Sequence, residues 1–251
     1  MIEDGAWPAS EEGAPQGASA SPLLADVYLH YVFDLRARHW RNRQAHGDVI
    51  IVRFADDIVA GFQHRADAER FHADLAERFA RFNLELNAEK TRLIESGRFA
   101  AENRRRRGLG QPGTFSFPGF THICGKTRAG RFALRRRTIA KKMAARLSEV
   151  NALLMQRRHW PIPELGEWPG SVVRGHIAYY AVPGNIHAVS ACRKQVTRHW
   201  GRALRRRSQR HRVTWERMGR LEARWLPAAR ITHPWPNVRF DARTQGRSPV
   251  R

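Results

Sequence analysis

Two adjacent aspartates, Asp56 and Asp57, interrupt a run of β-branched and other apolar residues that extends from Val49 to Gly61. Val and Ile favour β-strands, so the run predicts two short buried strands with the acidic pair at the turn between them. Neighbouring carboxylates repel each other, and in a hydrophobic hairpin this repulsion is costly unless a cation neutralises them. Mg²⁺ prefers oxygen ligands of this kind and completes its shell with water or substrate phosphates. A solvated Asp-Asp turn is the alternative that the pair alone leaves open.

The positive charge of the chain is concentrated in its second half. Residues 1–125 contain 16 Lys and Arg against 17 Asp and Glu, whereas residues 126–251 contain 29 against 6. The net charges of the two halves are therefore −1 and +23, and the basic half holds six of the eight tryptophans. A nucleic acid is the expected partner, because each neutralised phosphate releases counterions and adds sequence-independent affinity. A membrane surface is the weaker alternative, since no lipidation signal or basic amphipathic terminus is present.

Length and composition restrict the remaining classes of protein. A chain of 251 residues can bury one large core or two modest ones. No apolar run approaches the length of a membrane span and the N-terminus does not resemble a signal peptide, so we expect a soluble, cytoplasmic protein with no membrane partner. Cys124 and Cys192 lack CxxC spacing, which argues against a disulfide framework or a zinc site.

The periodicity of the apolar residues predicts an α+β fold for the first half of the chain. A helix should follow Ser21-Pro22, a second amphipathic helix should cover residues 66–82, and short strands should lie at 84–86 and 92–94. The apolar face of the first helix is expected to consist of Leu23, Leu24, Val27, Tyr28, Tyr31, Val32 and Leu35.

The second half of the chain is expected to be mostly helical. The arginines at 104–107 and the Gly/Pro cluster that follows predict a flexible boundary, and a turn-rich hairpin should span residues 114–134. From residue 138 onward the apolar spacing is that of helices. The last of these helices is expected to be short and to be followed by a Pro-rich basic tail.

The helix expected at about 187–207 combines an apolar face with dense positive charge. One face of it carries Val189, Cys192, Val196, Trp200 and Leu204. The rest of its surface carries Arg193, Lys194, Arg198, Arg202, Arg205, Arg206 and Arg207. Like charges at this density repel one another unless phosphates compensate, so this helix is the predicted RNA-binding element.

Several motifs, in order along the chain, resemble the reverse transcriptase–maturase proteins encoded by group II introns. Gly13-Ala14-Pro15-Gln16-Gly17 is similar to the family's Pro-Gln-Gly motif, and Phe54-Ala55-Asp56-Asp57 is similar to its Tyr/Phe-Ala-Asp-Asp motif. Residues 86–91 resemble the family's Glu-Lys-Thr segment, and residues 115–122 resemble its primer-grip turn. Residues 174–185 and 205–209 resemble its maturase or thumb region.

The resemblance implies an arrangement of domains. It implies a partial polymerase palm, an antiparallel sheet with helices, at residues 1–100, and a linker with a primer-grip-like hairpin at 101–134. An all-helical basic thumb or maturase domain would follow at 135–235, and a basic tail at 236–251.

The resemblance also implies RNA-directed DNA polymerase chemistry by two-metal nucleotidyl transfer, with Mg²⁺ as cofactor. Asp56 would be a metal ligand, and Asp57 would support it or bind more weakly. Lys90 would lie near the leaving phosphate as a point charge or acid, with a solvated lysine as the alternative.

Substrate contacts and partners follow from the same resemblance. Phe54 would pack under the sugar of the incoming nucleotide, with a core aromatic as the alternative, and Gln16 and Gly17 would line the nucleotide and template pocket. The implied partners are nucleotides, an RNA/DNA template-primer, and intron RNA whose splicing the protein assists.

The sequence departs from the family pattern in ways that bear on activity. The family has another metal-binding aspartate well upstream of Pro-Gln-Gly, whereas only fourteen residues precede Pro15 and Asp4 lies too close. Pro118 stands where the primer-grip turn usually has Leu, which removes an N–H and a possible strand bond. A second chain could supply the missing fingers and aspartate, and we expect no primer extension by this chain alone. The alternatives are an RNA-binding maturase fragment without polymerase activity and a decayed, truncated product.

Overall fold

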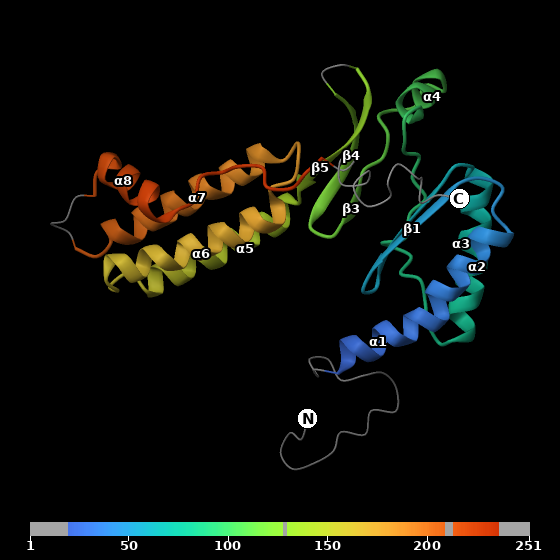
Figure 1. Ribbon diagram of the computed structural model, residues 1–251, viewed down its shortest axis with the longest axis horizontal. Coiled ribbons are helices and arrows are strands. Elements are labelled where there is room, and N and C mark those ends of the chain that lie inside the picture. The colour runs from blue at the N-terminus through green and yellow to red at the C-terminus, as the bar shows by residue number, and fades with distance from the viewer. Residues whose placement is uncertain (1–19, 128–129, 209–212, 236–251) are drawn as a thin grey trace, which may run out of the picture. The chain divides into compact units, whose positions relative to one another are not determined.

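The computed structural model describes residues 20–127, 130–208 and 213–235 (Figure 1). The fold is α+β, and the chain divides into two compact units whose described parts are residues 20–93 and residues 94–235 with the same gaps. Among the helices of these described residues, none combines the length and the hydropathy that crossing a bilayer requires.

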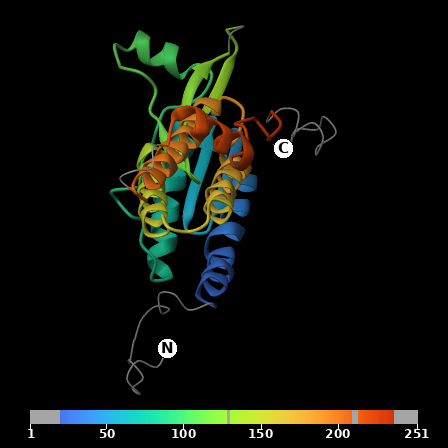
Figure 2. The ribbon, with the colours of Figure 1, turned by 90° about the vertical axis from the view of Figure 1, so that its left-hand side faces the viewer.

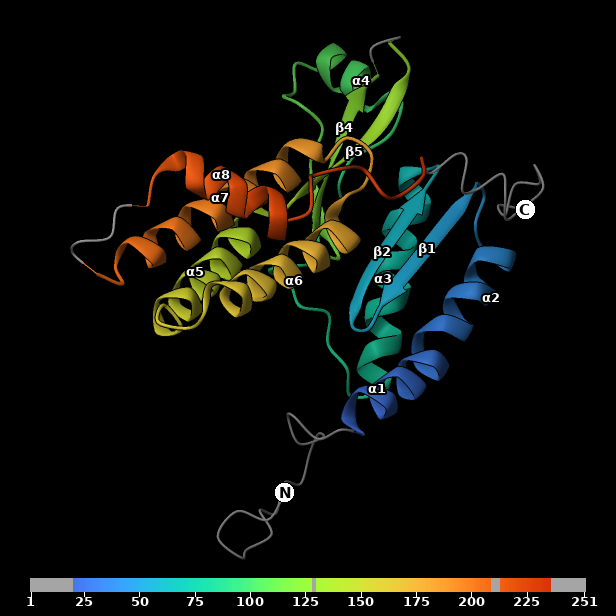
Figure 3. The same ribbon diagram turned by 60° about the vertical axis from the view of Figure 1, so that its left-hand side comes forward.

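The first unit is a two-stranded antiparallel sheet with helices on one face (Figure 3). In chain order it contains α1 (Ser21–Leu29), the π-helical turn η1 (His30–Asp34), α2 (Leu35–Arg43), β1 (Val49–Phe54), β2 (Asp57–Phe62) and α3 (Arg65–Arg81). The predicted hairpin is confirmed, and so is the predicted amphipathic helix at 66–82, which is α3.

Only one face of the hairpin is buried. Val49 is opposite Phe62 and Ile51 is opposite Ala60, and these residues contribute to a core with the buried Trp40 of α2. On the opposite face Ile50, Val52 and Phe54 are exposed, the last by 61%. The prediction that both strands are buried is therefore wrong. A strand with one buried face normally alternates apolar and polar residues, and here both faces carry apolar residues, so the sequence does not reveal the exposed face.

The predicted apolar face of the first helix is also wrong, apart from Val32. Leu23, Leu24, Val27, Tyr28, Tyr31 and Leu35 are all exposed. α1 buries none of its residues, whereas Phe33 of η1 and Ala37 and Trp40 of α2 are buried in the core. Arg78 of α3 donates to the carbonyls of Val32 at 2.5 Å and Tyr31 at 3.1 Å, which lie inside η1.

The short strands predicted at 84–86 and 92–94 are absent from the structure. Residues 84–87 and 91–96 have no regular secondary structure, although Leu84 and Leu86 pack against the core of the first unit. Leu93 of the second segment is exposed, and no described strand pairs with either segment.

The second unit joins a small sheet to a helical bundle. Its elements are α4 (Ala100–Arg106), β3 (Phe115–Phe117), β4 (Phe120–Lys126), β5 (Phe132–Thr138), α5 (Ala140–Gln156), α6 (Ile162–Tyr180), α7 (Ile186–Arg205) and α8 (Trp215–Trp225). The predicted hairpin is part of a three-stranded antiparallel sheet in the order β3-β4-β5. The arginine run expected to be a flexible boundary is helical, because it forms the end of α4.

The helical bundle is built around α7, against which α5, α6 and α8 pack. The predicted apolar face of α7 is confirmed: Val189, Cys192, Val196, Trp200 and Leu204 are all buried. Leu154 of α5, Leu165 of α6 and Met218 of α8 complete the same core, each with essentially no exposed surface.

A buried asparagine joins the sheet of the second unit to its helices. Asn185, just before α7, accepts a hydrogen bond from the backbone N–H of Thr138 at 3.1 Å. Its amide nitrogen donates to the Thr138 hydroxyl at 2.8 Å and to the carbonyl of Tyr180 at 2.9 Å. The ends of β5 and α6 and the start of α7 are thereby tied together at one point.

Candidate functional site

The acidic pair lies at the free end of the β1–β2 hairpin. Phe54 is paired with Asp57, so that Ala55 and Asp56 form a two-residue turn. Ala55 has a φ of +52°, a conformation that costs a non-glycine residue about 1–2 kcal/mol. The turn is thus held in a strained geometry that the surrounding contacts must stabilise.

Arg53 supplies these contacts from the buried face of the hairpin. Its Nη1 donates to the carbonyl oxygen of Ala55 at 3.1 Å and to Asp26 of α1 at 2.5 Å. Its Nε and Nη2 donate to the two carboxylate oxygens of Asp34 at 2.9 and 2.7 Å. One guanidinium therefore fixes the turn to two points of the helix that precedes the sheet.

The protonation states of this pair follow from the contact. Hydrogen bonding to Arg53 lowers the pKa of Asp34, and the same bond, followed by the one to Asp26, raises the pKa of Arg53. The side chain of Arg53 is only 14% exposed, so the charge pair is shielded from water on the guanidinium side. Sequence analysis missed this role, for which the visible signal was a lone arginine within an apolar strand.

Asp56 and Asp57 are both exposed, and no hydrogen bond or ion pair to either carboxylate is found among the described residues. Two adjacent carboxylates without a protein cation fit a Mg²⁺ ion, which is usually bound by one or two carboxylates together with substrate phosphates. In the part of the chain that the structure describes, no cluster of three or more His, Cys, Asp or Glu residues is arranged to hold a metal. The pair fits as part of a metal site and is not by itself a complete cage.

The remaining predicted catalytic and substrate residues have different surroundings. Phe54 is exposed on the same sheet face as Asp57, so the alternative of a core aromatic is wrong. Lys90 is exposed in a turn, where its backbone N–H is capped by the Asn87 side chain at 3.0 Å. Among the described residues, Lys90 makes no hydrogen bond or ion pair with the acidic pair. Gln16 and Gly17 lie outside the described residues.

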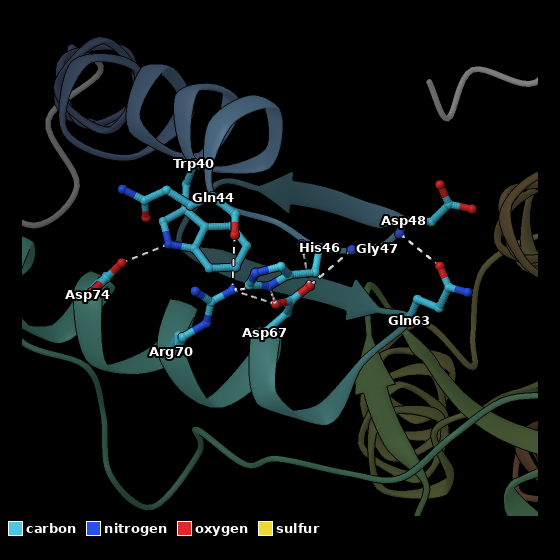
Figure 4. A network of polar contacts seen from close by, with 9 residues as sticks. All are labelled: Trp40, Gln44, His46, Gly47, Asp48, Gln63, Asp67, Arg70 and Asp74. Atoms are coloured by element: carbon cyan, nitrogen blue, oxygen red, sulfur yellow. Dashed lines mark hydrogen bonds and ion pairs between the residues drawn. The ribbon is translucent and has the colours of Figure 1, made fainter.

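The other end of β1 is held by a polar cluster that centres on Asp67 (Figure 4). The Asp67 carboxylate is 1% exposed and accepts the backbone N–H groups of His46 at 2.9 Å and Gly47 at 3.2 Å. Arg70 donates to the same carboxylate at 2.6 Å. The hydrogen bond from His46 is the largest cause that lowers the pKa of Asp67, followed by the one from Arg70. This cluster fixes the entry into β1, and sequence analysis missed it because its members are not adjacent in sequence.

The turn between β3 and β4 corresponds to the predicted primer-grip-like segment. Pro118 and Gly119 are its two central residues, and Gly119 has a φ of +76°, as in a type II turn. Pro118 therefore costs no ladder bond, contrary to the expectation from sequence. The Tyr179 hydroxyl of α6 donates to the Pro118 carbonyl at 3.0 Å, and a Cβ on Gly119 would lie 3.0 Å from the Tyr180 hydroxyl. The turn is thus seated on the end of α6.

The helix predicted at about 187–207 is α7, which ends at Arg205, and the predicted RNA-binding residues on it and directly after it divide into two groups. Three have partners within the second unit: Arg193 pairs with Glu222, Arg205 donates to the Val213 carbonyl at 3.2 Å and lies over the Trp215 ring, and Arg207 donates to the Trp160 carbonyl. Burial lowers the pKa of Arg207.

The other group consists of Lys194, Arg198 and Arg202 of α7 and of Arg206, which directly follows the helix; we call these four residues the basic stripe. All four are exposed, and no side-chain hydrogen bond or ion pair within the described residues involves them. They recur every four residues, so they lie along one side of the helix, where their charge faces solvent.

Comparison with known proteins agrees with the geometry of the first half of the chain. A search of curated proteins gave no match. The family model described as reverse transcriptase (RNA-dependent DNA polymerase) matches residues 4–122, which include the β1–β2 hairpin and the β3–β4 turn. This match supports a reverse transcriptase domain in the first half of the chain and suggests RNA-directed DNA polymerase activity, with nucleotides and a template-primer as partners.

Proposed function

We propose that the chain is part of a group II intron reverse transcriptase–maturase, in which the first unit contributes to the polymerase palm. The observation that carries the proposal is the exposed Asp56-Asp57 pair at a hairpin tip that Arg53 fixes to the preceding helix. Asp56 is the proposed metal ligand and Asp57 its support. Phe54, which lies opposite Asp57, is the proposed platform for the nucleotide sugar.

The chemistry proposed for the hairpin is two-metal nucleotidyl transfer. When bound, Mg²⁺ would neutralise charge on the nucleotide phosphates and activate the primer hydroxyl. The chain's own contribution is to hold two carboxylates at a fixed, solvent-accessible point, with Phe54 beside them. We propose Lys90, Gln16 and Gly17 as further nucleotide contacts on the basis of their motifs alone.

A second polypeptide is the proposed source of the third carboxylate. The exposed apolar residues Ile50 and Val52 form the sheet face next to the acidic pair, and a two-stranded sheet rarely stands alone. A strand that carries an aspartate and pairs with an edge of this two-stranded sheet would extend the sheet, and its aspartate would complete the metal site. This arrangement is the reason we expect the chain alone to extend no primer.

The second unit is the proposed thumb or maturase domain, which binds intron RNA and assists splicing. The basic stripe supports this assignment, because four exposed cations in a row repel one another unless an anionic backbone lies along them. Arg193, Arg205 and Arg207 serve mainly to hold the bundle together, so they are weaker candidates for RNA contact.

RNA binding is tested by removal of the basic stripe. We expect the triple variant Lys194→Ala, Arg198→Ala, Arg202→Ala to bind a transcribed group II intron RNA more weakly and to reduce the salt slope of log Kd by about two to three. The matched control replaces Arg38, Arg41 and Arg43, three exposed arginines of the first unit, and removes the same charge. Fluorescence anisotropy at several salt concentrations reads out both variants, and an equal loss in both would refute a specific interface on α7.

The polymerase part is tested by metal binding and by primer extension. Mn²⁺, used as a spin probe for Mg²⁺, should bind less well to Asp56→Asn than to the control Asp48→Asn, which removes an exposed carboxylate elsewhere in the first unit. Primer extension on an RNA template with Mg²⁺ should stay at background. Strong extension by this chain alone, abolished by Asp56→Ala, would show that no second polypeptide is needed.

The alternative function is an RNA-binding module that performs no chemistry. The charge distribution favours it independently of the hairpin, since the net charge of +23 lies in residues 126–251. Intact RNA binding together with equal Mn²⁺ affinity of the wild type and Asp56→Asn would select this alternative.

A further inference from the structure

The helical bundle of the second unit contains a groove between α5 and α6. Both helices pack on α7, and the space between them is a cavity of about 490 Å³; Figure 2 shows them as two separate helices joined at one end. Its floor is formed by the buried residues Val150, Cys192 and Val196. The volume lies within the range of about 300–1,000 Å³ that is typical of small-ligand sites.

The walls of the groove are mainly apolar on both sides, and one buried ring nitrogen among the described lining residues lacks a hydrogen-bond partner. Met143 of α5 and Trp168 of α6 are partly buried side chains on opposite walls. His176 Nε2 is buried and has no hydrogen-bond partner among the described residues. The His176 ring stacks on Tyr180, with 4.5 Å between the ring centroids. A buried nitrogen without a partner is costly, so a ligand or water that bonds to it would be favoured.

The rim of the groove on the α5 side is positively charged. Lys142 and Arg146 lie one helical turn apart and are both exposed. Arg146 also pairs with Glu149 at 2.7 Å, whereas Lys142 has no partner among the described residues. Burial lowers the pKa of His176 and raises the pKa of Cys192 to about 11, so at neutral pH the groove itself holds an uncharged imidazole and a thiol. The positive charge is therefore confined to the rim.

We propose that this groove takes one nucleotide, with its base between the α5 and α6 walls and its phosphate on Lys142. A mainly apolar slot with a buried, unpartnered ring nitrogen fits a planar base that can hydrogen-bond to it, and the cationic rim fits the attached phosphate. The inference rests on the proposed function of the second unit, since an unpaired base of bound RNA is the natural source. Free nucleotides share the same chemistry, and a carboxylate on an alkyl chain is the competing occupant.

Methionine methyl NMR of the full chain tests the groove directly. The sequence has four methionines, of which Met143 lines the groove and Met218 is completely buried elsewhere in the bundle, so one spectrum contains both the probe and its control. With ¹³C-methyl methionine, assigned by Met→Leu variants, UMP or AMP should shift Met143 and leave Met218 unchanged. Ribose 5-phosphate, which lacks a base, should shift neither.

Two outcomes of the titration would overturn the proposal. One is no shift of Met143 at about ten-millimolar UMP and AMP, well above the weak-binding range of affinities. The other is a Met143 shift with octanoate at concentrations where the nucleotides have no effect, which would assign the groove to an alkyl carboxylate. A short single-stranded RNA that shifts Met143 at lower concentration than UMP would identify RNA as the source of the nucleotide.

Neighbouring lysines provide matched variants. Lys142→Ala should weaken UMP binding about ten-fold, the worth of one charge-assisted hydrogen bond, whereas Lys141→Ala, which removes an exposed charge that does not line the groove, should change it less than two-fold. Equal losses in both variants would mean non-specific attraction and would overturn the proposal. RNA binding that depends on the basic stripe while UMP leaves Met143 unmoved would defeat this inference alone. A Met143 response without intron RNA binding would defeat the proposed function alone.

Discussion

Arg53 and Asp34 are joined by two parallel hydrogen bonds, Nε to Oδ1 at 2.9 Å and Nη2 to Oδ2 at 2.7 Å. The fork of the guanidinium matches the carboxylate, and a lysine could reach only one of the two oxygens. Arg53→Lys should therefore lower the free energy of unfolding by about 1–2 kcal/mol, measured by urea denaturation. Arg38→Lys, at an exposed arginine of the same unit, should change it by less than about 0.5 kcal/mol. Equal stability of the two variants would show that the fork contributes nothing.

The positive φ of Ala55 predicts an unusual stabilisation by glycine. Ala55→Gly should raise the free energy of unfolding by about 0.5 kcal/mol, because relief of the left-handed strain slightly exceeds the entropy that glycine loses on folding. Ala60→Gly, in the middle of β2, should have the opposite sign. Urea denaturation of the two variants measures both changes in the free energy of unfolding. A destabilising effect of Ala55→Gly would contradict the strained turn.

Asp67 should make stability depend on acidity. Because hydrogen bonding from His46 and Arg70 lowers its pKa in the folded state, its contribution is complete above the ordinary carboxyl pKa and is lost as the pH falls below that value. Asp67→Asn should lower the melting temperature at pH 7 and flatten its decline between about pH 5 and pH 3. Asp48→Asn, which removes an exposed carboxylate nearby, should leave that decline as it is in the wild type. Parallel declines in all three proteins would exclude a role for Asp67.

Gly119 should resist substitution for two separable reasons. Gly119→Ala introduces a Cβ at a φ of +76°, 3.0 Å from the Tyr180 hydroxyl, so we expect a loss of about 2 kcal/mol or more. In the background of Tyr180→Phe, which removes that hydroxyl, the loss should be smaller, but the backbone cost of about 1–2 kcal/mol and the approach of the Cβ to Tyr179 Cε1 at 3.1 Å remain. A double-mutant cycle in urea measures the difference, and full additivity would show that the approach to the Tyr180 hydroxyl carries no cost.

Local patterns allowed the hairpin and most of the bundle to be predicted from sequence. The β-branched run around Asp56 is typical of strands and the apolar spacing of α7 is that of a helix, so the hairpin was predicted with its correct turn and α7 with its correct buried face. The hairpin's exposed side was not foreseen, since Ile50 and Val52 are as apolar as their buried neighbours.

What the sequence could not reveal depends on partners that are distant along the chain. The contact of Arg53 with Asp26 spans 27 residues, and no local pattern selects that pair. Which arginines of α7 have a partner and which face solvent also depends on tertiary contacts. In the sequence Arg193 cannot be distinguished from Arg198, but in the structure Arg193 pairs with Glu222 of α8. The Asp67 cluster was missed for the same reason.

The direction in which the side chains of α1 point depends on the number of residues in the π-helical turn at His30–Asp34, and not only on the chemistry of those side chains. One residue corresponds to about 100° of helical rotation, so deletion of a single codon within this turn would swing α1 around its axis while leaving α2 and its buried Trp40 in place. Leu23, Leu24 and Val27 would then point in a new direction without any of them being changed. Insertions and deletions at this position can therefore reorient an apolar surface in one step. Point substitutions on either side of the turn cannot reorient that surface.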